Sequence, residues 1–358
     1  MKKVSSFVPE VGKKLAQYNG VEIIDRIGEE TIKAVVFSIL NGSNVRSLTE
    51  GLTRKRLALS NASLLVTYLN ASKSIENFTE NLPLIVAEEL KAARLSKEEK
   101  IYLQWLIGLT GKSIQNVLRS DADEVNNYLK ELDLALKNSA NEALNIFGPL
   151  IGTLKIKESE MQLSWPAITN IFMAIGAQTL AIRGAEKSMY GKLFEKLILG
   201  SMLSILGFQQ IKNNDTTKKE KVFWLSERGE KRESDATLLI KPGVGIRFDI
   251  GFIGPGNTEI SLDKVSRFER EMEFGRKNYF MSTIILVDRI GEKSRIVELA
   301  KRIDGNIIQM SMSNWVKHVA EVLNKSVDYK HPIIKMNGVQ VSNYIRSEMD
   351  KISLKNFI

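Results

Sequence analysis

The chain contains no cysteine, which excludes a disulfide scaffold, thiolate catalysis and a thiolate metal site. It has only two histidines, His318 and His331, so a histidine-rich zinc centre is not expected. The lack of cysteine is consistent with a reducing compartment, and the predicted location is the cytoplasm. The N-terminal segment MKKVSSFVPEVGKK has lysines but no apolar stretch after them, so it is not expected to be a signal peptide.

One uncharged run of 18 residues, WPAITNIFMAIGAQTLAI at 165–182, raises the question of a membrane span. Three residues argue against a membrane span: Pro166 is a helix breaker, and Asn170 and Gln178 would place polar amides in the lipid. Ser164 is placed to cap a helix, and Pro166 suits its first turn. The run therefore predicts a helix buried in a protein core, and no membrane partner is expected.

The 358 residues suffice for two domains with at least one large core, and 43% of them are apolar. Lysine and arginine number 51 against 42 acidic residues, giving a net charge of +9. Such a balance is compatible with nucleic acid or an anionic membrane surface, but it selects neither.

The first 185 residues read as mostly helical, with apolar residues three and four apart over 31–40, 57–69, 84–95 and 101–118. Breaks are predicted at 41–43, 81–83 and 148–149. A basic cluster, Arg54, Lys55 and Arg56, either meets phosphates or forms a solvated helix face. The run GLTGKS at 108–113 is not a phosphate loop, because Leu106 stands where its first glycine belongs and no strand precedes it.

After residue 185 the periodicity changes. Helices are predicted at 190–208, 262–279, 294–303 and 315–323, and strands at 221–225, 236–240, 245–253, 283–287 and 306–310. Lys241-Pro242-Gly243 is a strong turn signal between the second and third strands. A meander followed by crossovers predicts an α/β (α+β) fold, with a mixed sheet flanked by helices and an N-terminal helical domain.

The hairpin brings two aspartates together. With a three-residue turn, Ile240 pairs with Val244, and counting back places Asp235 opposite Asp249. Side chains directly opposite on one face have Cβ atoms about 5 Å apart, so the carboxylates would repel unless a divalent cation lay between them. A two-residue turn would offset the pair and weaken this argument.

Strand alternation supports the same arrangement. Phe248, Ile250 and Phe252 face one side of the sheet, where they would pack on a helix. Asp249 faces the other side, together with Arg247 and Gly251, and Glu259 follows the next turn. Alternatively, Asp235 and Asp249 are solvent-facing strand residues, and Glu259 interacts with a helix dipole.

These residues resemble the PD-(D/E)xK nuclease superfamily, particularly type II restriction endonucleases, over about Ser188 to Met312. Ser234-Asp235 corresponds to the Pro-Asp pair and Asp249-Ile250-Gly251 to the (D/E)-x-K motif, with Gly251 replacing the lysine. Glu195 corresponds to the glutamate of the first core helix. In another alignment, Asp249 acts with Glu259-Ile260-Ser261, where Ser261 replaces the lysine.

The resemblance implies a helical domain at 1–185 for DNA recognition or dimerisation, a nuclease core at 186–325 and a helical tail at 326–358. It further implies a homodimer that cuts double-stranded DNA with Mg²⁺ held by Asp235, Asp249, Glu259 and Glu195. Lys264 is the candidate for the missing lysine, and Arg267 and Arg270 of the same predicted helix would contact phosphates. Two alternatives remain, a DNA-binding protein with a decayed nuclease core and a repair or junction nuclease.

Overall fold

The computed structural model describes residues 3–17, 20–91, 95–116, 122–212, 220–226, 234–251, 280–288 and 305–358. The chain forms two compact units. The helical unit comprises Met1–Tyr18 and Gly51–Ser188, and the sheet unit comprises Asn19–Glu50 and Met189–Ile358. The segment Asn19–Glu50 and the C-terminal tail therefore belong with the sheet.

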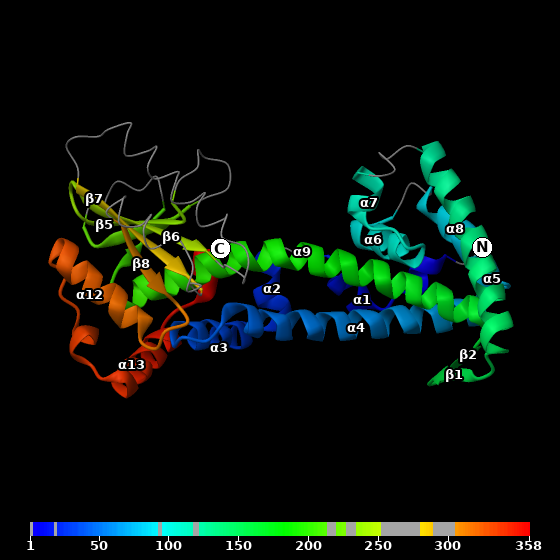
Figure 1. Ribbon diagram of the computed structural model, residues 1–358, viewed down its shortest axis with the longest axis horizontal. Coiled ribbons are helices and arrows are strands. Elements are labelled where there is room, and N and C mark those ends of the chain that lie inside the picture. The colour runs from blue at the N-terminus through cyan, green and yellow to red at the C-terminus, as the bar shows by residue number, and fades with distance from the viewer. Residues whose placement is uncertain are drawn as a thin grey trace. The chain divides into compact units, whose positions relative to one another are not determined.

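The helical unit contains one small β-hairpin among its helices (Figure 1). Its described elements are η1 (Val4–Phe7), α1 (Glu10–Ala16), most of α4 (Val45–Ser74), α5 (Phe78–Leu90), α6 (Lys97–Leu106), α7 (Gly111–Asn116), α8 (Ala122–Phe147), β1 (Thr153–Ile156), β2 (Ser159–Gln162) and the first part of α9 (Trp165–Ile205). Its core is a contiguous cluster of buried apolar side chains that includes Tyr68, Tyr102 and Trp105.

The predicted break at 81–83 is wrong, because Pro83 lies inside α5. A proline cannot donate a hydrogen bond to the carbonyl four residues earlier, which here belongs to Thr79. The side-chain amide of Asn170 donates to that Thr79 carbonyl at 3.1 Å and replaces the missing donor. A contact from a distant helix thus offsets the lost hydrogen bond, which is part of the usual penalty for proline in a helix.

Helix α9 is a single helix, whereas the sequence predicted separate helices at 165–182 and 190–208. By length and composition alone, α9 could cross a membrane. Its polar side chains Asn170 and Gln178 are buried, and both donate to backbone carbonyls, of Thr79 and Ser60 respectively. These contacts are those of a helix packed against protein, as the sequence predicted.

The described strands of the sheet unit form one sheet in the order β3-β4-β5-β6-β7-β8. Their bounds are β3 (Gln209–Gln210), β4 (Val222–Leu225), β5 (Ala236–Lys241), β6 (Val244–Gly251), β7 (Phe280–Val287) and β8 (Gly305–Gln309). Strands β4, β5 and β6 form an antiparallel meander, and β6, β7 and β8 run parallel. The predicted mixed sheet is confirmed, and the helices predicted at 262–279 and 294–303 lie outside the described residues.

The other described elements of the sheet unit come from both ends of the chain and from α9. They are α2 (Gly20–Ile27), α3 (Glu29–Leu40), α12 (Trp315–Val327), η2 (Pro332–Lys335), α13 (Gly338–Asp350) and η3 (Leu354–Phe357), with the C-terminal part of α9. The last turns of α9 and helix α12 lie along one side of the sheet (Figure 1).

The C-terminal tail is held to the sheet unit by three kinds of contact. The Tyr329 hydroxyl donates to the Leu206 carbonyl at 2.5 Å, and the Leu354 amide donates to the Glu29 carboxylate at 2.8 Å. Gly200 of α9 lies so close to the Phe357 ring that an added Cβ would approach it to 2.5 Å. The predicted helical tail is thus part of the sheet unit.

The β5–β6 turn depends on a glycine, which gives a first test of the hairpin. Gly243 has φ 80°, so Gly243→Ala should lower the free energy of unfolding by about 1 kcal/mol. Gly191 lies within helix α9 and has no atom within 4 Å of an added Cβ, so Gly191→Ala should raise it by about 0.5–1 kcal/mol. Urea denaturation of both variants measures these changes. If both substitutions changed the free energy of unfolding in the same direction, the turn geometry would be contradicted.

Candidate active site at the β5–β6 hairpin

The acidic end of the hairpin has the register that the sequence predicted, although the turn differs. Lys241 pairs with Val244, so only Pro242 and Gly243 form the turn, rather than three residues. An irregularity between Leu239 and Lys241 adds one residue to β5 and compensates for the shorter turn. Ala236 consequently pairs with Phe248, and Asp235, one residue earlier, falls opposite Asp249.

The two faces of the sheet differ in the way that alternation predicts. One face carries Leu238, Phe248 and Ile250, all fully buried, with Ile284 and Leu286 beside them on β7. The other face carries Thr237, Arg247 and Asp249, of which Thr237 and Arg247 are only half-buried. The β7 side chains beside Asp249 on this face, those of Thr283, Ile285 and Val287, are buried, so the half-buried Thr237 and Arg247 are its more open part. Phe252, predicted to extend the apolar face, lies outside the described residues.

Asp249 is 6% exposed in the middle of a strand. Burying a carboxylate is costly unless it is compensated, and aspartate is a poor strand former. Asp235 is half-buried, and its Oδ2 accepts a hydrogen bond from the Ile250 amide at 2.8 Å. The Asp235 carboxylate therefore lies against β6, at the residue next to Asp249.

This donor set fits a magnesium ion. Mg²⁺ prefers oxygen ligands and is commonly held by one or two carboxylates, with water and substrate phosphate completing its shell. Asp235 and Asp249 supply two carboxylates on facing positions. Within the described part of the chain, no group of three or more His, Cys, Asp or Glu side chains is arranged to hold a metal.

Among the described residues, no other predicted ligand joins Asp235 and Asp249 in a possible metal site. Glu195 is half-buried on α9 and joins no such group of three there. Glu259, the candidate lysine Lys264 and the predicted phosphate contacts Arg267 and Arg270 fall within 252–279, outside the described residues.

The basic cluster on α4 divides into two kinds of side chain. Arg54 and Lys55 are exposed, as a phosphate contact requires. Arg56 is 5% exposed, donates to the carbonyls of Leu15 and Ala16, and forms a 3.2 Å ion pair with buried Glu186. The prediction that Arg56 contacts DNA is therefore corrected, because its guanidinium is engaged in the core of the helical unit.

Sequence reasoning missed a second buried aspartate beside the hairpin, Asp288, which is 4% exposed. Asp288 directly follows β7, its amide donates to the Gly251 carbonyl at 3.2 Å, and its Oδ2 accepts from the Asn44 side chain at 2.9 Å. This contact fixes the loop before α4 to the ends of β6 and β7. The available signal was an aspartate directly after the buried run TIILV, but nothing local indicated Asn44 as its partner.

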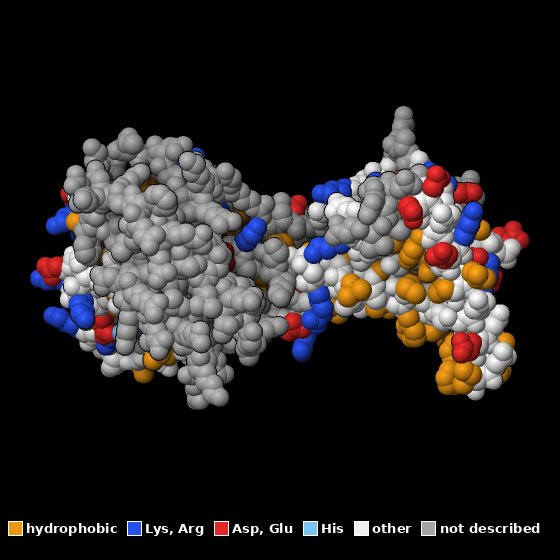
Figure 2. All heavy atoms as spheres, turned by 45° about the horizontal axis from the view of Figure 1, so that its top comes forward, with side chains coloured by type: hydrophobic (Ala, Val, Ile, Leu, Met, Phe, Trp, Pro, Cys, Tyr) orange, Lys and Arg blue, Asp and Glu red, His pale blue; other side chains and the backbone are white. Residues whose placement is uncertain are grey.

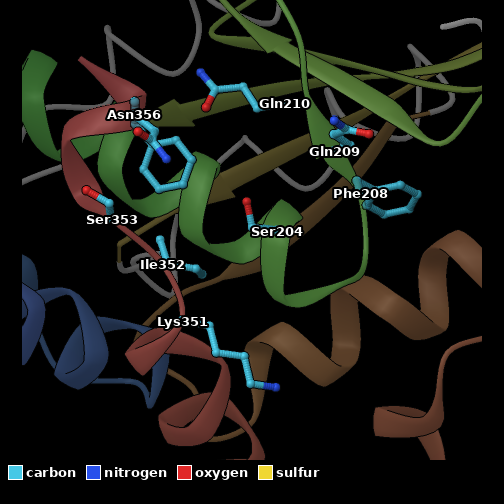
Figure 3. Close-up of a pocket in the computed structure, with 9 residues that line it drawn as sticks. Ser204, Phe208, Gln209, Gln210, Lys351, Ile352, Ser353 and Asn356 are labelled. Atoms are coloured by element: carbon cyan, nitrogen blue, oxygen red, sulfur yellow. The ribbon is translucent and has the colours of Figure 1, made fainter.

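A separate pocket of about 420 Å³ lies elsewhere in the sheet unit (Figure 3). Ser204 of α9 and Gln209 and Gln210 of β3 line it, together with Ser353 and Asn356 of the tail. None of its lining residues in the described part of the chain carries a carboxylate, so they do not suit a divalent cation, and the hairpin remains the candidate active site.

Comparison with known proteins gives one family and one curated relative. Residues 29–295 match the family described as CfrBI restriction endonuclease. The chain is 38% identical over 346 residues to the type II restriction enzyme CfrBI of Citrobacter freundii, covering 96% of this chain and 95% of that protein. No solved structure matches the chain.

Proposed function

Because the chain belongs to the CfrBI restriction endonuclease family, and is thus a type II site-specific deoxyribonuclease, we propose that Asp235 and Asp249 form its magnesium-dependent active site. The proposed substrate is double-stranded DNA, cut at a fixed sequence by hydrolysis of phosphodiester bonds. The observation that supports this site is the pairing of Ala236 with Phe248, from which we infer that Asp235, one residue earlier, lies opposite Asp249.

Each aspartate has a distinct task in the proposed mechanism. Asp249 offers a carboxylate from within a central strand, where it pairs with Ile285 of β7 and its neighbour Phe248 pairs with Ala236 of β5. Asp235 is oriented by the hydrogen bond from the Ile250 amide, which holds its carboxylate beside β6. When bound between them, Mg²⁺ would lower the pKa of a bound water and stabilise charge on the scissile phosphate.

The lysine of the related motif must come from elsewhere, because Gly251 occupies its position on β6. We assign its task to Lys264, whose ammonium would orient the attacking water or stabilise the transition state. Glu259 or Glu195 would hold a second ion or its waters. Arg54 and Lys55, both exposed on α4, and Arg267 and Arg270 would contact phosphates.

Two further properties follow from this function. A two-fold homodimer would present two active sites to the two strands of a palindromic sequence. The enzyme would act in the cytoplasm, where DNA is accessible.

Digestion of plasmid DNA tests the proposal. With Mg²⁺ the chain should give a discrete set of fragments, and excess EDTA should abolish cleavage until Mg²⁺ is restored, because the aspartates alone cannot activate water. Binding of DNA without cleavage would favour a decayed nuclease core, in which Gly251 has replaced the catalytic lysine of the motif. Cleavage confined to branched DNA would indicate a junction nuclease, and both results would contradict restriction.

A further inference from the structure

Strand β6 carries an arginine, Arg247, on the same face of the sheet as Asp249. Side chains two residues apart on a strand point to the same side, and their Cα atoms lie roughly 7 Å apart. Asp249 is 6% exposed, whereas Arg247 is half-buried and belongs to the more open part of that face. The strand thus places a cation beside the buried carboxylate.

The register brings Arg247 near both aspartates. Arg247 pairs with Thr237 of β5 and with Thr283 of β7, neither of which carries a charge. Asp235 precedes Thr237 by two residues, so it is diagonal to Arg247 across the two strands. Diagonal neighbours on adjacent strands lie about 7–8 Å apart, within reach of a long side chain. The arginine can therefore reach the space in front of both carboxylates.

Charged residues are rare in the described strands of this sheet, β3 to β8. They are Lys241, Arg247 and Asp249. Lys241 lies next to the turn and pairs with Val244, which alternation places on the opposite face. Arg247 is thus the cation that these strands offer on the face of the aspartates.

The chemistry of arginine suits a phosphate better than a water molecule. Its guanidinium keeps its charge in proteins, so it cannot take a proton from an attacking water. Its N–H groups form a rigid fork that matches two oxygens of a phosphate. The two negative charges of Asp235 and Asp249 balance those of one Mg²⁺, so the charge of the scissile phosphate requires a further cation.

We propose that Arg247 is a further catalytic residue, whose guanidinium binds a non-bridging oxygen of the scissile phosphate. The contact would hold the phosphate beside Asp249 whether or not a metal ion is present, and it would stabilise the charge that develops during hydrolysis. Activation of the water stays with another group, for which Lys264 is the candidate. The inference rests on the proposed function, because the phosphate belongs to the DNA that is cut.

The exposed cations of the helical unit suit a different task. Arg54 and Lys55 have exposed side chains on α4, and Figure 2 shows lysine and arginine side chains spread over this unit between acidic ones. Such hydrated side chains contact the DNA backbone without selecting one phosphate. Arg247 instead extends from a residue that is paired on both sides, so its Cα has a defined place relative to Asp249.

Single-turnover cleavage gives the first test. Arg247→Ala should lower the cleavage rate by about 10²–10³-fold, the usual effect of removing one donor from a developing negative charge. Lys241→Ala is the matched control, because it removes a cation from the same hairpin but from the opposite face. The control should cut at the wild-type rate. A wild-type rate in Arg247→Ala would overturn the inference.

A neutral phosphate tests the contact without cleavage. In EDTA, DNA with a methylphosphonate at the linkage that the wild type cuts should bind the wild type about 10-fold more weakly than unmodified DNA does, the order of one charge-assisted hydrogen bond. Arg247→Ala should lose this preference for the unmodified DNA, because the cation that detects the charge is gone. Lys241→Ala should keep the preference of the wild type.

The same comparison separates a phosphate contact from a structural role. Both DNAs are bound by the same variant, so any loss of folded protein lowers the two affinities equally and cancels. An arginine that only offset the repulsion between Asp235 and Asp249 would leave the preference of Arg247→Ala as large as that of the wild type. That result would overturn the inference.

Failure of the proposed function would give a different pattern. If the wild type bound DNA but cut none, the nuclease would be refuted. Single methylphosphonates placed at each linkage of the bound duplex would still show whether one neutral phosphate weakens binding of the wild type but not of Arg247→Ala. If one does, the phosphate contact stands without the nuclease, and if none does, both fail.

Discussion

Asp249→Asn is expected to lower the rate of DNA cleavage by at least about 10³-fold. The substitution preserves the shape of the side chain but removes the negative charge that a magnesium ion requires, which is worth several kcal/mol in the transition state. Affinity for cognate DNA should change little when measured in EDTA, because the proposed phosphate contacts lie on other residues. Single-turnover cleavage with Mg²⁺ and filter binding in EDTA give the two quantities.

Asp328→Asn provides the matched control for that variant. Asp328 is exposed, follows α12 and has φ 53°, a conformation that asparagine also adopts readily. Its cleavage rate should equal that of the wild type. If Asp249→Asn cuts at the wild-type rate, or if both variants are equally slow, the assignment of Asp249 is wrong.

Arg56→Ala is expected to lower the free energy of unfolding by about 3–5 kcal/mol. The change removes an ion pair in which both side chains are buried, together with the bonds from the guanidinium to the carbonyls of Leu15 and Ala16. Thermal unfolding followed by calorimetry should show a lower transition temperature. Lys55→Ala, its exposed neighbour, should change stability by less than about 0.5 kcal/mol.

A double variant separates the charge from the packing. Arg56→Met with Glu186→Leu removes both ends of the buried pair, and such replacements often restore much of the lost stability. The double variant should therefore be more stable than Arg56→Ala. If Arg56→Ala unfolds like the wild type but binds DNA more weakly, Arg56 contacts DNA after all and its structural assignment is wrong.

Features set by neighbouring residues were predictable from the sequence. The strands β4 to β8 follow from short apolar runs between turn signals, and the Pro242-Gly243 turn from its dipeptide. The register of the aspartates was also predicted, although its cause was different. The turn is one residue shorter than predicted, and the irregularity between Leu239 and Lys241 adds one residue to β5. The two departures therefore offset each other.

Features that depend on distant residues were not predictable. Pro83 stays in a helix because Asn170 supplies a donor, and Asp288 is held by Asn44, 244 residues earlier in the chain. Arg56 looked like a surface cation because periodicity does not reveal that Glu186 lies beside it. Glu195 remains a prediction because it joins no group of three possible ligands among the described residues, and Glu259, Lys264, Arg267 and Arg270 remain predictions because they lie outside those residues.

The most direct measurement is a crystal structure of the chain with cognate DNA and Mn²⁺, in which anomalous scattering locates the metal. The proposed active site predicts a peak bonded to carboxylate oxygens of both Asp235 and Asp249, next to a phosphate of the duplex. A peak bound by other residues, or DNA lying against the opposite face of the sheet, would contradict it.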